Sequence, residues 1–331
     1  MTSEKPIRIV AMGKYLPEKV DSDEIEKRHG IPSGWSQKYS GVVSRHYVNE
    51  ESVGFMGARA AEQALKNSNL TLNDIDLIIS AGGSHDYIIP NQASIIKNQM
   101  EGGNSSDCPA IDIDSTCLSF VTALSIVSKI LDGESMKTAL IVSSEVASKG
   151  LDYSNWETTT LFGDGAGAAV VMYDEESDSC IVKANQKTYS EGAYNAIIEG
   201  GGIVNYFNEH PYDPQMHSFK MKGKKMLRMA KKKLPEFIDV FFSDLNCKLT
   251  DCTVVIPHQA SKMGLHIFKQ MYNFKDNQLK ESLANYGNCI AASIPMTLAD
   301  CIERGEIKRG DTCFMVGTSA GFSIGGMLIK F

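Results

Sequence analysis

The sequence predicts an α/β fold composed of two related halves, and two observations support this. Strand-like apolar runs alternate with helix-like segments along the 331 residues, which is the pattern of an α/β protein. An apolar strand, a short turn and a helix also follow one another in each half. A polar break at residues 174–178 separates the halves, so we expect a division into residues 1–173 and 174–331.

The individual elements follow from hydrophobic periodicity and from turn residues. We expect strands at residues 7–10, 76–80, 110–113, 139–143, 168–172, 253–256, 313–316 and 326–329. We expect helices at residues 52–66, 117–131, 224–245, 262–271 and 292–304. The helix expected from Cys117 is apolar on nearly all sides, which predicts a buried central helix. Pro235 indicates either a kink or the first turn of the helix at 224–245.

Composition excludes several classes of function. Hydrophobic residues make up 43% and charged residues 22%, which is typical of a globular protein. The net charge of −7 argues against general affinity for nucleic acid. No apolar run approaches the roughly 20 residues needed for membrane insertion, and no secretory signal is visible, so we expect a cytoplasmic protein. The eight cysteines form no CxxC or Cys/His pattern, so we expect reduced thiols and no metal site.

Cys117 is a candidate nucleophile because it stands between a predicted strand and the buried helix. A thiol at a helix N-terminus meets the positive end of the helix dipole, which lowers its pKa and favours the thiolate. The alternative is a packed core cysteine, as most reduced cysteines are. The position of Cys117 alone leaves both interpretations open.

Two further polar residues, His258 and Asn288, are candidates for the site. His258 comes directly after the strand at 253–256, where α/β folds gather catalytic groups, although a structural histidine is an equal alternative. Asn288 can donate a hydrogen bond, although its place after Gly287 favours a turn or helix-cap residue. The glycine-rich run 163–167 precedes a strand rather than a helix, which argues against nucleotide binding.

Six segments in order resemble the β-ketoacyl-acyl carrier protein synthase III family, condensing enzymes of the thiolase superfamily. They are residues 15–18 (YLPE), 40–46 (SGVVSRH), 114–120 (DSTCLSF), 162–170 (FGDGAGAAV), 258–260 (HQA) and 287–295 (GNCIAASIP). The resemblance covers nearly the whole chain. It implies a thiolase-like fold, with two pseudo-duplicated halves in a layered αβαβα arrangement around a central buried helix.

The resemblance also implies an acyltransferase that performs a decarboxylative Claisen condensation in two steps. Cys117 would take the acyl group of an acyl-CoA, and a malonyl thioester would then lose CO₂ and attack that group. His258 and Asn288 would donate hydrogen bonds to the enolate oxyanion, and backbone N–H groups of Cys117 and the Gly321 region would hold the acyl oxyanion. Coenzyme A thioesters are then substrates, and no tightly bound cofactor is expected.

Peripheral residues are predicted by the same resemblance. Trp35 and Arg45 are expected to bind the nucleotide of coenzyme A, although Tyr39 replaces an arginine of the family there. Lys262, Lys224 and Lys225 are candidates for docking the acidic acyl carrier protein, and a solvated helix face explains the basic stretch equally well. A homodimer is also implied, with residues 84–90 reaching into the partner.

Departures from the family pattern leave alternatives open. Residues 151–160 are fewer than in typical members, and residues 317–322 (GTSAGF) replace consecutive glycines. A non-decarboxylating acyltransferase, or a head-to-head condenser of two acyl chains, is one alternative, and a non-catalytic acyl-binding subunit is another. The acyl chain, the carrier of the extender and the pathway, whether fatty-acid initiation or a specialised lipid or polyketide pathway, stay open.

Overall fold

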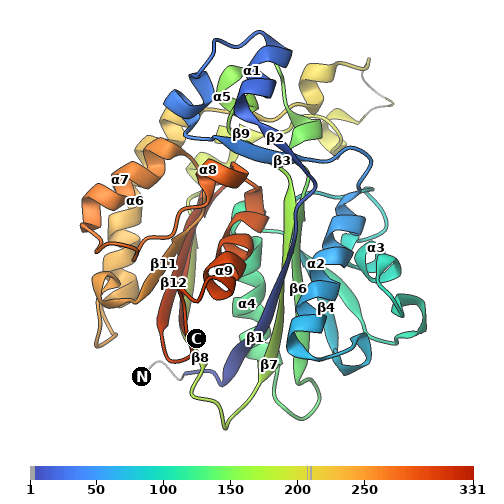
Figure 1. Cartoon of the computed structure of the whole chain (residues 1–331), viewed down its shortest axis with the longest axis vertical. Helices are drawn as coiled ribbons and strands as arrows, with labels where there is room; N and C mark the ends of the chain where they lie inside the picture. The colour runs from blue at the N-terminus through green and yellow to red at the C-terminus, as the bar shows by residue number, and fades with distance from the viewer. Residues whose placement is uncertain (1–3, 207, 209–210) are drawn as a thin grey trace.

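Two large β-sheets pack with helices into five layers (Figure 1). Two further pairs of short strands lie outside these sheets: β2 (Glu18–Asp21) with β3 (Ser44–Tyr47), and β9 (Ala196–Ile197) with β10 (Lys220–Met221). A computed structural model describes residues 4–206, 208 and 211–331. The first sheet has the order β1 (Ile7–Tyr15), β7 (Gly165–Tyr173), β6 (Thr138–Glu145), β4 (Leu77–Ala81), β5 (Ala110–Ile113). The second has the order β11 (Val254–Pro257), β12 (Thr312–Ser319), β13 (Ser323–Lys330), β8 (Cys180–Thr188).

Helices fill the remaining layers. Helices α4 (Ser119–Ile130) and α9 (Ser293–Glu303) lie between the two sheets, in the centre of Figure 1. Helices α2 (Val53–Ser68) and α3 (Gln92–Gln99) cover the outer face of the first sheet, and α6 (Gly223–Phe242) and α7 (Lys262–Tyr272) cover that of the second. The largest hydrophobic cluster joins α4 and α9 to both sheets, so it is the central layer that holds the halves together.

Shorter elements gather at one end of the layers, at the top of Figure 1. They are β2 (Glu18–Asp21), α1 (Ser22–His29), the π-helix η1 (Ser36–Ser40), β3 (Ser44–Tyr47), α5 (Trp156–Thr159), β9 (Ala196–Ile197), β10 (Lys220–Met221) and α8 (Leu283–Tyr286). This end lies beyond the C-terminal ends of β4, β6 and β11, where α/β folds place their sites.

The strands form where the sequence is continuously apolar. Strand β4 pairs in parallel with both β5 and β6, and every residue of β4 and β6 is buried. A parallel strand covered on both faces needs apolar side chains on both, which explains why these runs show no alternation.

The predicted α/β arrangement is confirmed, and each predicted strand and helix overlaps an observed one within the described residues. Strand β8, helix α3 and the shorter elements gathered at one end, α1 among them, were not predicted. Pro235 lies in the interior of α6 and not in its first turn. The division at residue 173 stays a prediction, which is supported by the fact that the first sheet ends with β7 and the second begins with β8. Within the described residues, no helix is long and apolar enough to span a bilayer.

Candidate active site between the two halves

Cys117 lies in a tight turn between β5 and the central helix α4. The turn is the 3₁₀-helix η4 (Thr116–Leu118), so the predicted helix starts two residues later, at Ser119. Thr116 has a φ of 50°, a left-handed conformation that few residues other than glycine adopt. The Ser119 hydroxyl fixes this turn, because it accepts the Ser115 N–H at 2.9 Å and donates to the Thr116 carbonyl at 2.7 Å.

The predicted lowering of the Cys117 pKa is wrong. Burial, together with the nearby charge of Glu145, raises the pKa of Cys117 to about 12. The backbone N–H groups of Ala320 and of Cys117 itself face the sulfur and act in the opposite direction. Removal from water penalises the thiolate more than these dipoles stabilise it. Cys117 is therefore a neutral thiol in the free protein.

The N–H groups of Cys117 and of the Gly321 region were expected to hold an oxyanion, and the N–H of Ala320, next to Gly321, faces the Cys117 sulfur. The Ala320 carbonyl accepts the Thr116 hydroxyl at 3.4 Å, which links the two segments. Gly321 has a φ of 74° and supplies the turn that aims Ala320.

His258 is buried at the C-terminal end of β11. Its backbone N–H donates to the Val316 carbonyl at 2.8 Å, which keeps the residue beside β12. Burial lowers the pKa of His258 to about 4, so the imidazole is neutral at physiological pH. Its Nδ1 is buried, and no atom of the described residues lies within hydrogen-bonding distance of it. A neutral imidazole carries one N–H, which is available to a ligand.

Asn288 is held by its backbone and by one end of its side chain. Its N–H donates to the Leu161 carbonyl at 2.9 Å, and its Oδ1 accepts the Ile290 N–H at 2.9 Å. Its Nδ2 donates to the Ala260 carbonyl at 3.3 Å. Because an amide nitrogen has two hydrogens, one remains for a ligand beside the segment that carries His258.

The glycine-rich run at 163–167 supports Asn288. The Gly163 N–H donates to the Asn288 carbonyl at 3.1 Å, and a Cβ atom built on Gly163 would lie 2.1 Å from the Tyr286 carbonyl oxygen. Only glycine allows this approach. Asp164 is fully buried and accepts the N–H groups of Val48, Ala147 and Ser148. The run is thus a packing element.

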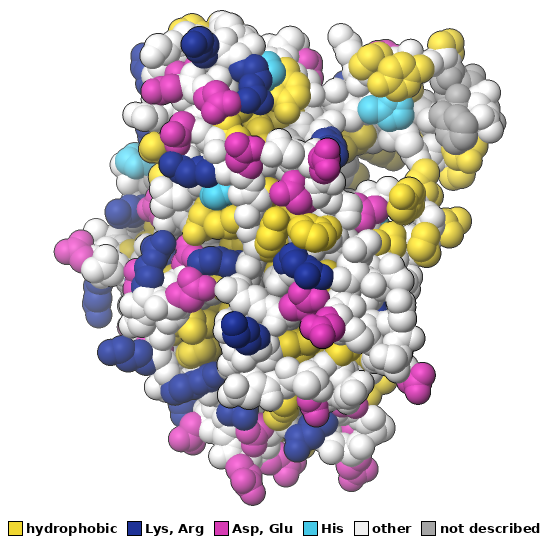
Figure 2. Space-filling view, turned by 45° about the vertical axis from the view of Figure 1, so that its right-hand side comes forward, with side chains coloured by type: hydrophobic (Ala, Val, Ile, Leu, Met, Phe, Trp, Pro, Cys, Tyr) yellow, Lys and Arg dark blue, Asp and Glu magenta, His cyan; other side chains and the backbone are white. Residues whose placement is uncertain are grey.

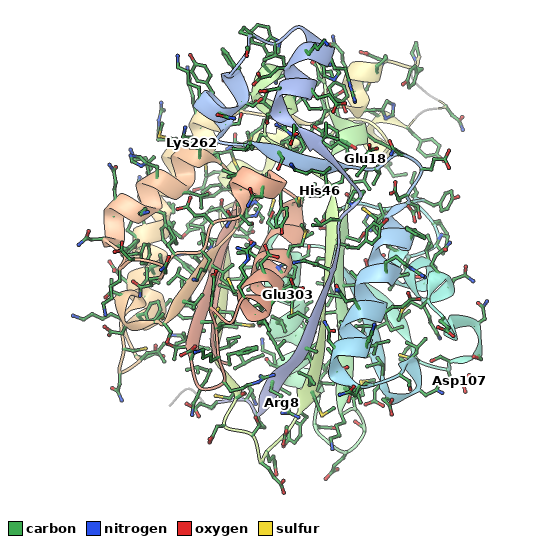
Figure 3. The ribbon with its side chains drawn as sticks, in the orientation of Figure 1. Arg8, Glu18, His46, Asp107, Lys262 and Glu303 are labelled. Carbon is green, nitrogen blue, oxygen red and sulfur yellow. The ribbon has the colours of Figure 1, made fainter. Side chains whose placement is uncertain are left out.

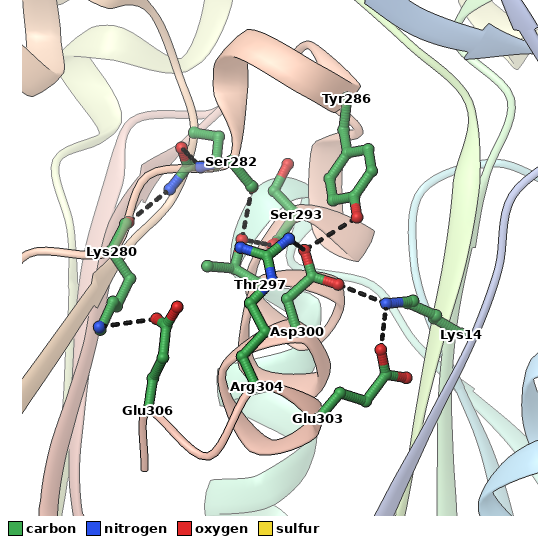
Figure 4. Close-up of polar contacts among 11 residues, drawn as sticks. Lys14, Lys280, Ser282, Tyr286, Ser293, Thr297, Asp300, Glu303, Arg304 and Glu306 are labelled. Carbon is green, nitrogen blue, oxygen red and sulfur yellow. Dashed lines mark hydrogen bonds and ion pairs between the residues drawn. The ribbon is translucent and has the colours of Figure 1, made fainter.

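A polar network anchors the same turn from the outside (Figure 4). The Tyr286 hydroxyl donates to Asp300 of α9 at 2.8 Å, and Lys14 of β1 makes an ion pair with the same carboxylate. The Ser282 and Thr297 hydroxyls are 2.6 Å apart. Together these contacts fix α9 and the residues just before Asn288 to the first sheet.

The structure brings the three candidate catalytic residues to one place. A Cβ atom built on Gly317 would lie 2.7 Å from the Cβ of His258 and 3.3 Å from Cδ2 of Leu118, the neighbour of Cys117. Asn288 reaches Ala260, two residues after His258. A cavity of about 90 Å³ opens at His258 between α6 and α7. Its walls are mostly apolar and include Leu227, Leu234, Phe268 and Met271.

Trp35 lies in an aromatic cluster at the end of the molecule beyond the strands. Its ring centroid is 4.0 Å from that of Tyr39 and 5.1 Å from that of Trp156. The Glu26 carboxylate accepts the N–H groups of Gly34 and Ser36, each at 2.7 Å, and so fixes the backbone on both sides of Trp35. Trp35 is partly exposed, as a platform for a planar ligand must be.

The prediction that Arg45 binds a nucleotide is wrong. Arg45 is completely buried, and its guanidinium donates to the Thr159 carbonyl at 3.0 Å and to the Ser22 hydroxyl at 2.7 Å. Burial lowers the pKa of Arg45. The resemblance located this arginine correctly in the sequence, but its burial depends on the packing of α1, β3 and α5, which no local pattern reveals.

The three predicted docking lysines differ in their surroundings. Lys262 lies at the start of α7, where it faces the N-terminal segment (Figure 3). Its Nζ donates to the carbonyls of Gln37 and Lys38 at 3.0 Å each, so it joins α7 to η1. Lys224 and Lys225 are exposed in the first turn of α6, near the cavity.

Sequence reasoning missed Glu145, the last residue of β6. Its side chain is completely buried and accepts the Gly83 N–H at 2.9 Å and the Ser84 hydroxyl at 2.6 Å. Burial raises the pKa of Glu145 to about 7. The sequence contained one signal for Glu145: it is a charged residue at the end of an apolar strand. Such strand ends line the site of an α/β fold.

Comparisons with known proteins agree with this site. The family described as 3-oxoacyl-[acyl-carrier-protein] synthase III matches residues 111–190, and its C-terminal region matches residues 242–331. The β-ketoacyl-[acyl-carrier-protein] synthase III of Aliarcobacter butzleri is 32% identical over 97% of this chain and 96% of its own. That of Vesicomyosocius okutanii is 30% identical over 98% of both chains.

Solved structures of similar proteins have the same fold. The 3-oxoacyl-[acyl-carrier-protein] synthase III of Aquifex aeolicus superposes with a TM-score of 0.87 at 27% identity, over 98% of this chain and all of the other. The priming β-ketosynthase of the R1128 polyketide pathway has a TM-score of 0.87 at 21% identity, over 99% and 97% of the two chains, and shows the shared fold. This is the thiolase-like architecture that the resemblance implied.

Proposed function

The chain belongs to the 3-oxoacyl-[acyl-carrier-protein] synthase III family, and we propose that Cys117, His258 and Asn288 carry out its condensation reaction. The chain is a condensing enzyme that joins an acyl-CoA primer to a malonyl thioester with loss of CO₂. The convergence of these three residues between the two halves is the observation that carries the proposal.

In the first step, the Cys117 sulfur attacks the carbonyl carbon of the acyl-CoA. A carbon–sulfur bond forms to Cys117, the bond to the coenzyme A sulfur breaks, and the thiol proton leaves with coenzyme A. The N–H groups of Cys117 and Ala320 support this step, because they already face the sulfur and would lie near the developing oxyanion.

In the second step, the malonyl thioester loses CO₂ and becomes an enolate, which attacks the acyl carbon. The bond between that carbon and the Cys117 sulfur breaks, and the Cys117 thiolate takes up a proton from water. His258 and the Asn288 amide donate hydrogen bonds to the enolate oxygen. The pKa of His258, about 4, supports this role, because a neutral imidazole donates its N–H without first taking up a proton. The Asn288 amide is aimed by Ile290 and Ala260 and needs little reorganisation.

The thioester substrates would reach this site from the end of the molecule that carries Trp35. We propose that Trp35 and Tyr39 bind the adenine of coenzyme A and that Lys224 and Lys225 contact an acidic acyl carrier protein. The apolar cavity between α6 and α7 lies between these lysines and His258, which supports a shared route for both thioesters. Lys262 is not proposed for docking, since it already binds two carbonyls.

We also propose that the chain acts as a homodimer in the cytoplasm. Tyr87, Ile88 and Ile89, in the loop after β4, are 65%, 76% and 84% exposed, and Ile111 of the edge strand β5 is also exposed. Figure 2 shows hydrophobic side chains gathered towards one edge of the face that it presents. A second copy would bury such a surface. Light scattering at assay concentration tests the proposed homodimer, and a monomeric mass would contradict the proposal.

One experiment tests the proposed reaction. The protein is incubated with a panel of acyl-CoAs and weighed intact, and labelled malonyl thioester is then added to follow CO₂. We expect one acyl adduct, which is lost in Cys117→Ala and kept in the control Cys247→Ala, because Cys247, in the loop after α6, is not among the residues that line the cavity at His258. An adduct that persists in Cys117→Ala, or product without CO₂, would contradict the proposal.

A further inference from the structure

Gln259, just after β11, has a completely buried side chain whose hydrogen-bonding groups are all used. Its Nε2 donates to the carbonyls of Pro257 at 2.8 Å and Lys280 at 3.3 Å. Its Oε1 accepts the N–H groups of Ser282 at 2.9 Å and Leu283 at 3.1 Å. A side-chain amide has two donor hydrogens and two acceptor lone pairs, so these four bonds fix the amide in one orientation.

The four bonds join two segments, each of which carries one proposed donor to the enolate oxygen. One segment is residues 257–260, which includes His258. The other is residues 280–283, which leads through α8 to Asn288, two residues after that helix ends. The two N–H groups that Gln259 accepts stand at the start of α8, where backbone N–H groups have no partner within the helix. Gln259 therefore caps the helix that precedes Asn288.

A second contact holds the same two segments together. Asn288 Nδ2 donates to the Ala260 carbonyl at 3.3 Å, and the Ala260 N–H donates to the His258 carbonyl at 2.8 Å. Gln259 lies between His258 and Ala260 in the chain. The segments that carry His258 and Asn288 are therefore fixed to one another at two points, one of which is the Gln259 amide.

The segment that Gln259 reaches is itself anchored. The Ser282 hydroxyl lies 2.6 Å from the Thr297 hydroxyl of α9, the contact marked between these residues in Figure 4. The Lys280 N–H donates to the Val255 carbonyl of β11 at 2.9 Å. Gln259 thus ties the end of β11 to a segment that is already fixed to the central layer.

The two proposed donors must meet at a single oxygen atom. A malonyl thioester can shift to follow one donor, but it cannot follow two whose separation has changed. A misplacement of about 1 Å at a reacting group costs on the order of 100-fold in rate. Acylation depends on the N–H groups of Cys117 and Ala320, which belong to segments that the Gln259 side chain does not contact.

We propose that Gln259 is a positioning residue for the condensation step: its amide sets the separation between the His258 segment and the start of α8, and thereby aligns both donors on one enolate oxygen. This inference rests on the proposed function. Gln259 touches no substrate in this role, because its amide is buried among backbone groups. It should matter for decarboxylation far more than for acylation.

Gln259→Met tests the role, because it keeps a similar length and removes all four hydrogen bonds. Gln278→Met is the matched control. Gln278 is also buried, but it lies at the opposite end of β11, where its Nε2 donates to the carbonyls of Thr250 at 3.0 Å and Cys252 at 2.6 Å and its Oε1 accepts the Lys275 N–H at 3.1 Å. Two rates are measured: acylation by acetyl-CoA, from the intact mass, and CO₂ release from labelled malonyl thioester by the preformed acyl-enzyme.

We expect Gln259→Met to slow CO₂ release on the order of 10- to 100-fold and to change acylation less than about 2-fold. Gln278→Met should change neither rate. In an Asn288→Ala background, Gln259→Met should slow CO₂ release by less than about a further 2-fold, because only one donor is left to align. Equal losses in both rates, equal losses in the two variants, or a full additional loss in the Asn288→Ala background would overturn the inference.

Gln259→Glu gives the same comparison if Gln259→Met does not fold. One carboxyl oxygen still accepts the N–H groups of Ser282 and Leu283, and the other can keep at most one of the two donated bonds. A selective, smaller loss of CO₂ release supports the inference, and unchanged or equally reduced rates overturn it. If the unmodified protein forms no acyl-enzyme or releases no CO₂, the proposed function has failed. If it does both and Gln259→Met behaves like it, only the role of Gln259 has failed.

Discussion

Replacing Arg45 by methionine should weaken the fold and leave coenzyme A binding intact. The substitution keeps the length of the side chain but removes two hydrogen bonds from a completely buried guanidinium. An unsatisfied buried acceptor costs about 1–3 kcal/mol. Thr159 keeps a bond from the Tyr47 hydroxyl at 3.3 Å, and the Ser22 hydroxyl keeps its bond to Val42 at 2.7 Å. We therefore expect a loss of about 2–4 kcal/mol for the two acceptors together.

Urea denaturation measures this loss, and steady-state kinetics test the alternative that Arg45 holds the nucleotide. The KM for acetyl-CoA is compared with that for acetyl-N-acetylcysteamine, which lacks the nucleotide. We expect both KM values to change together, if at all. The control Arg28→Met removes an exposed pair with Glu24 and should cost less than about 1 kcal/mol. Unchanged stability with a KM increase confined to acetyl-CoA would refute the structural role of Arg45.

Three further predictions concern the site itself. The pKa of Glu145 is about 7 in the folded protein and 4.5 in the reference state, so its protonated form favours folding. The free energy of unfolding should therefore fall by about 1 kcal/mol more between pH 6 and pH 8 than in Glu145→Gln, and parallel pH profiles would contradict this. Gly317→Ala should displace His258, 2.7 Å from the new methyl group, and slow CO₂ release at least about 10-fold, whereas Gly202→Ala, which meets no atom, should not. Alkylation of Cys117 by iodoacetamide should rise steadily up to pH 9.5, because its pKa is about 12, and a plateau near pH 7 would reveal a stable thiolate.

The sequence predicted the elements that depend on local pattern. Continuous apolar runs predicted β4 and β6, and helical periodicity predicted α2. The ends of these elements differ from the predicted ones by one or two residues. Strand β8 was missed because residues 185–188, in its outer half, carry polar side chains at the edge of its sheet. The bends at Thr116 and Ile290 were hidden as well, since neither residue type favours positive φ.

The chemistry of the site was predictable only in part. The ordered motifs located Cys117, His258 and Asn288, and the structure brings all three together. Their roles stay proposals. The direction of the Cys117 pKa was wrong because the helix-dipole argument is local, whereas burial by β12 and the charge of Glu145 come from distant parts of the chain. The burial of Arg45 was missed for the same reason.

Two turns with the same geometry precede the central helices: Thr116 (φ 50°) and Ile290 (φ 47°) each begin a 3₁₀-helix that leads into α4 or α9. In the turn before α9, the Ile290 N–H is bound to Asn288 Oδ1 at 2.9 Å, so this turn orients a side chain of the protein itself. The turn before α4 keeps its amide beside a thiol that carries no charge at rest. A negative charge appears there only while a bond is being made or broken, so the amides of this turn can stabilise a short-lived oxyanion during turnover.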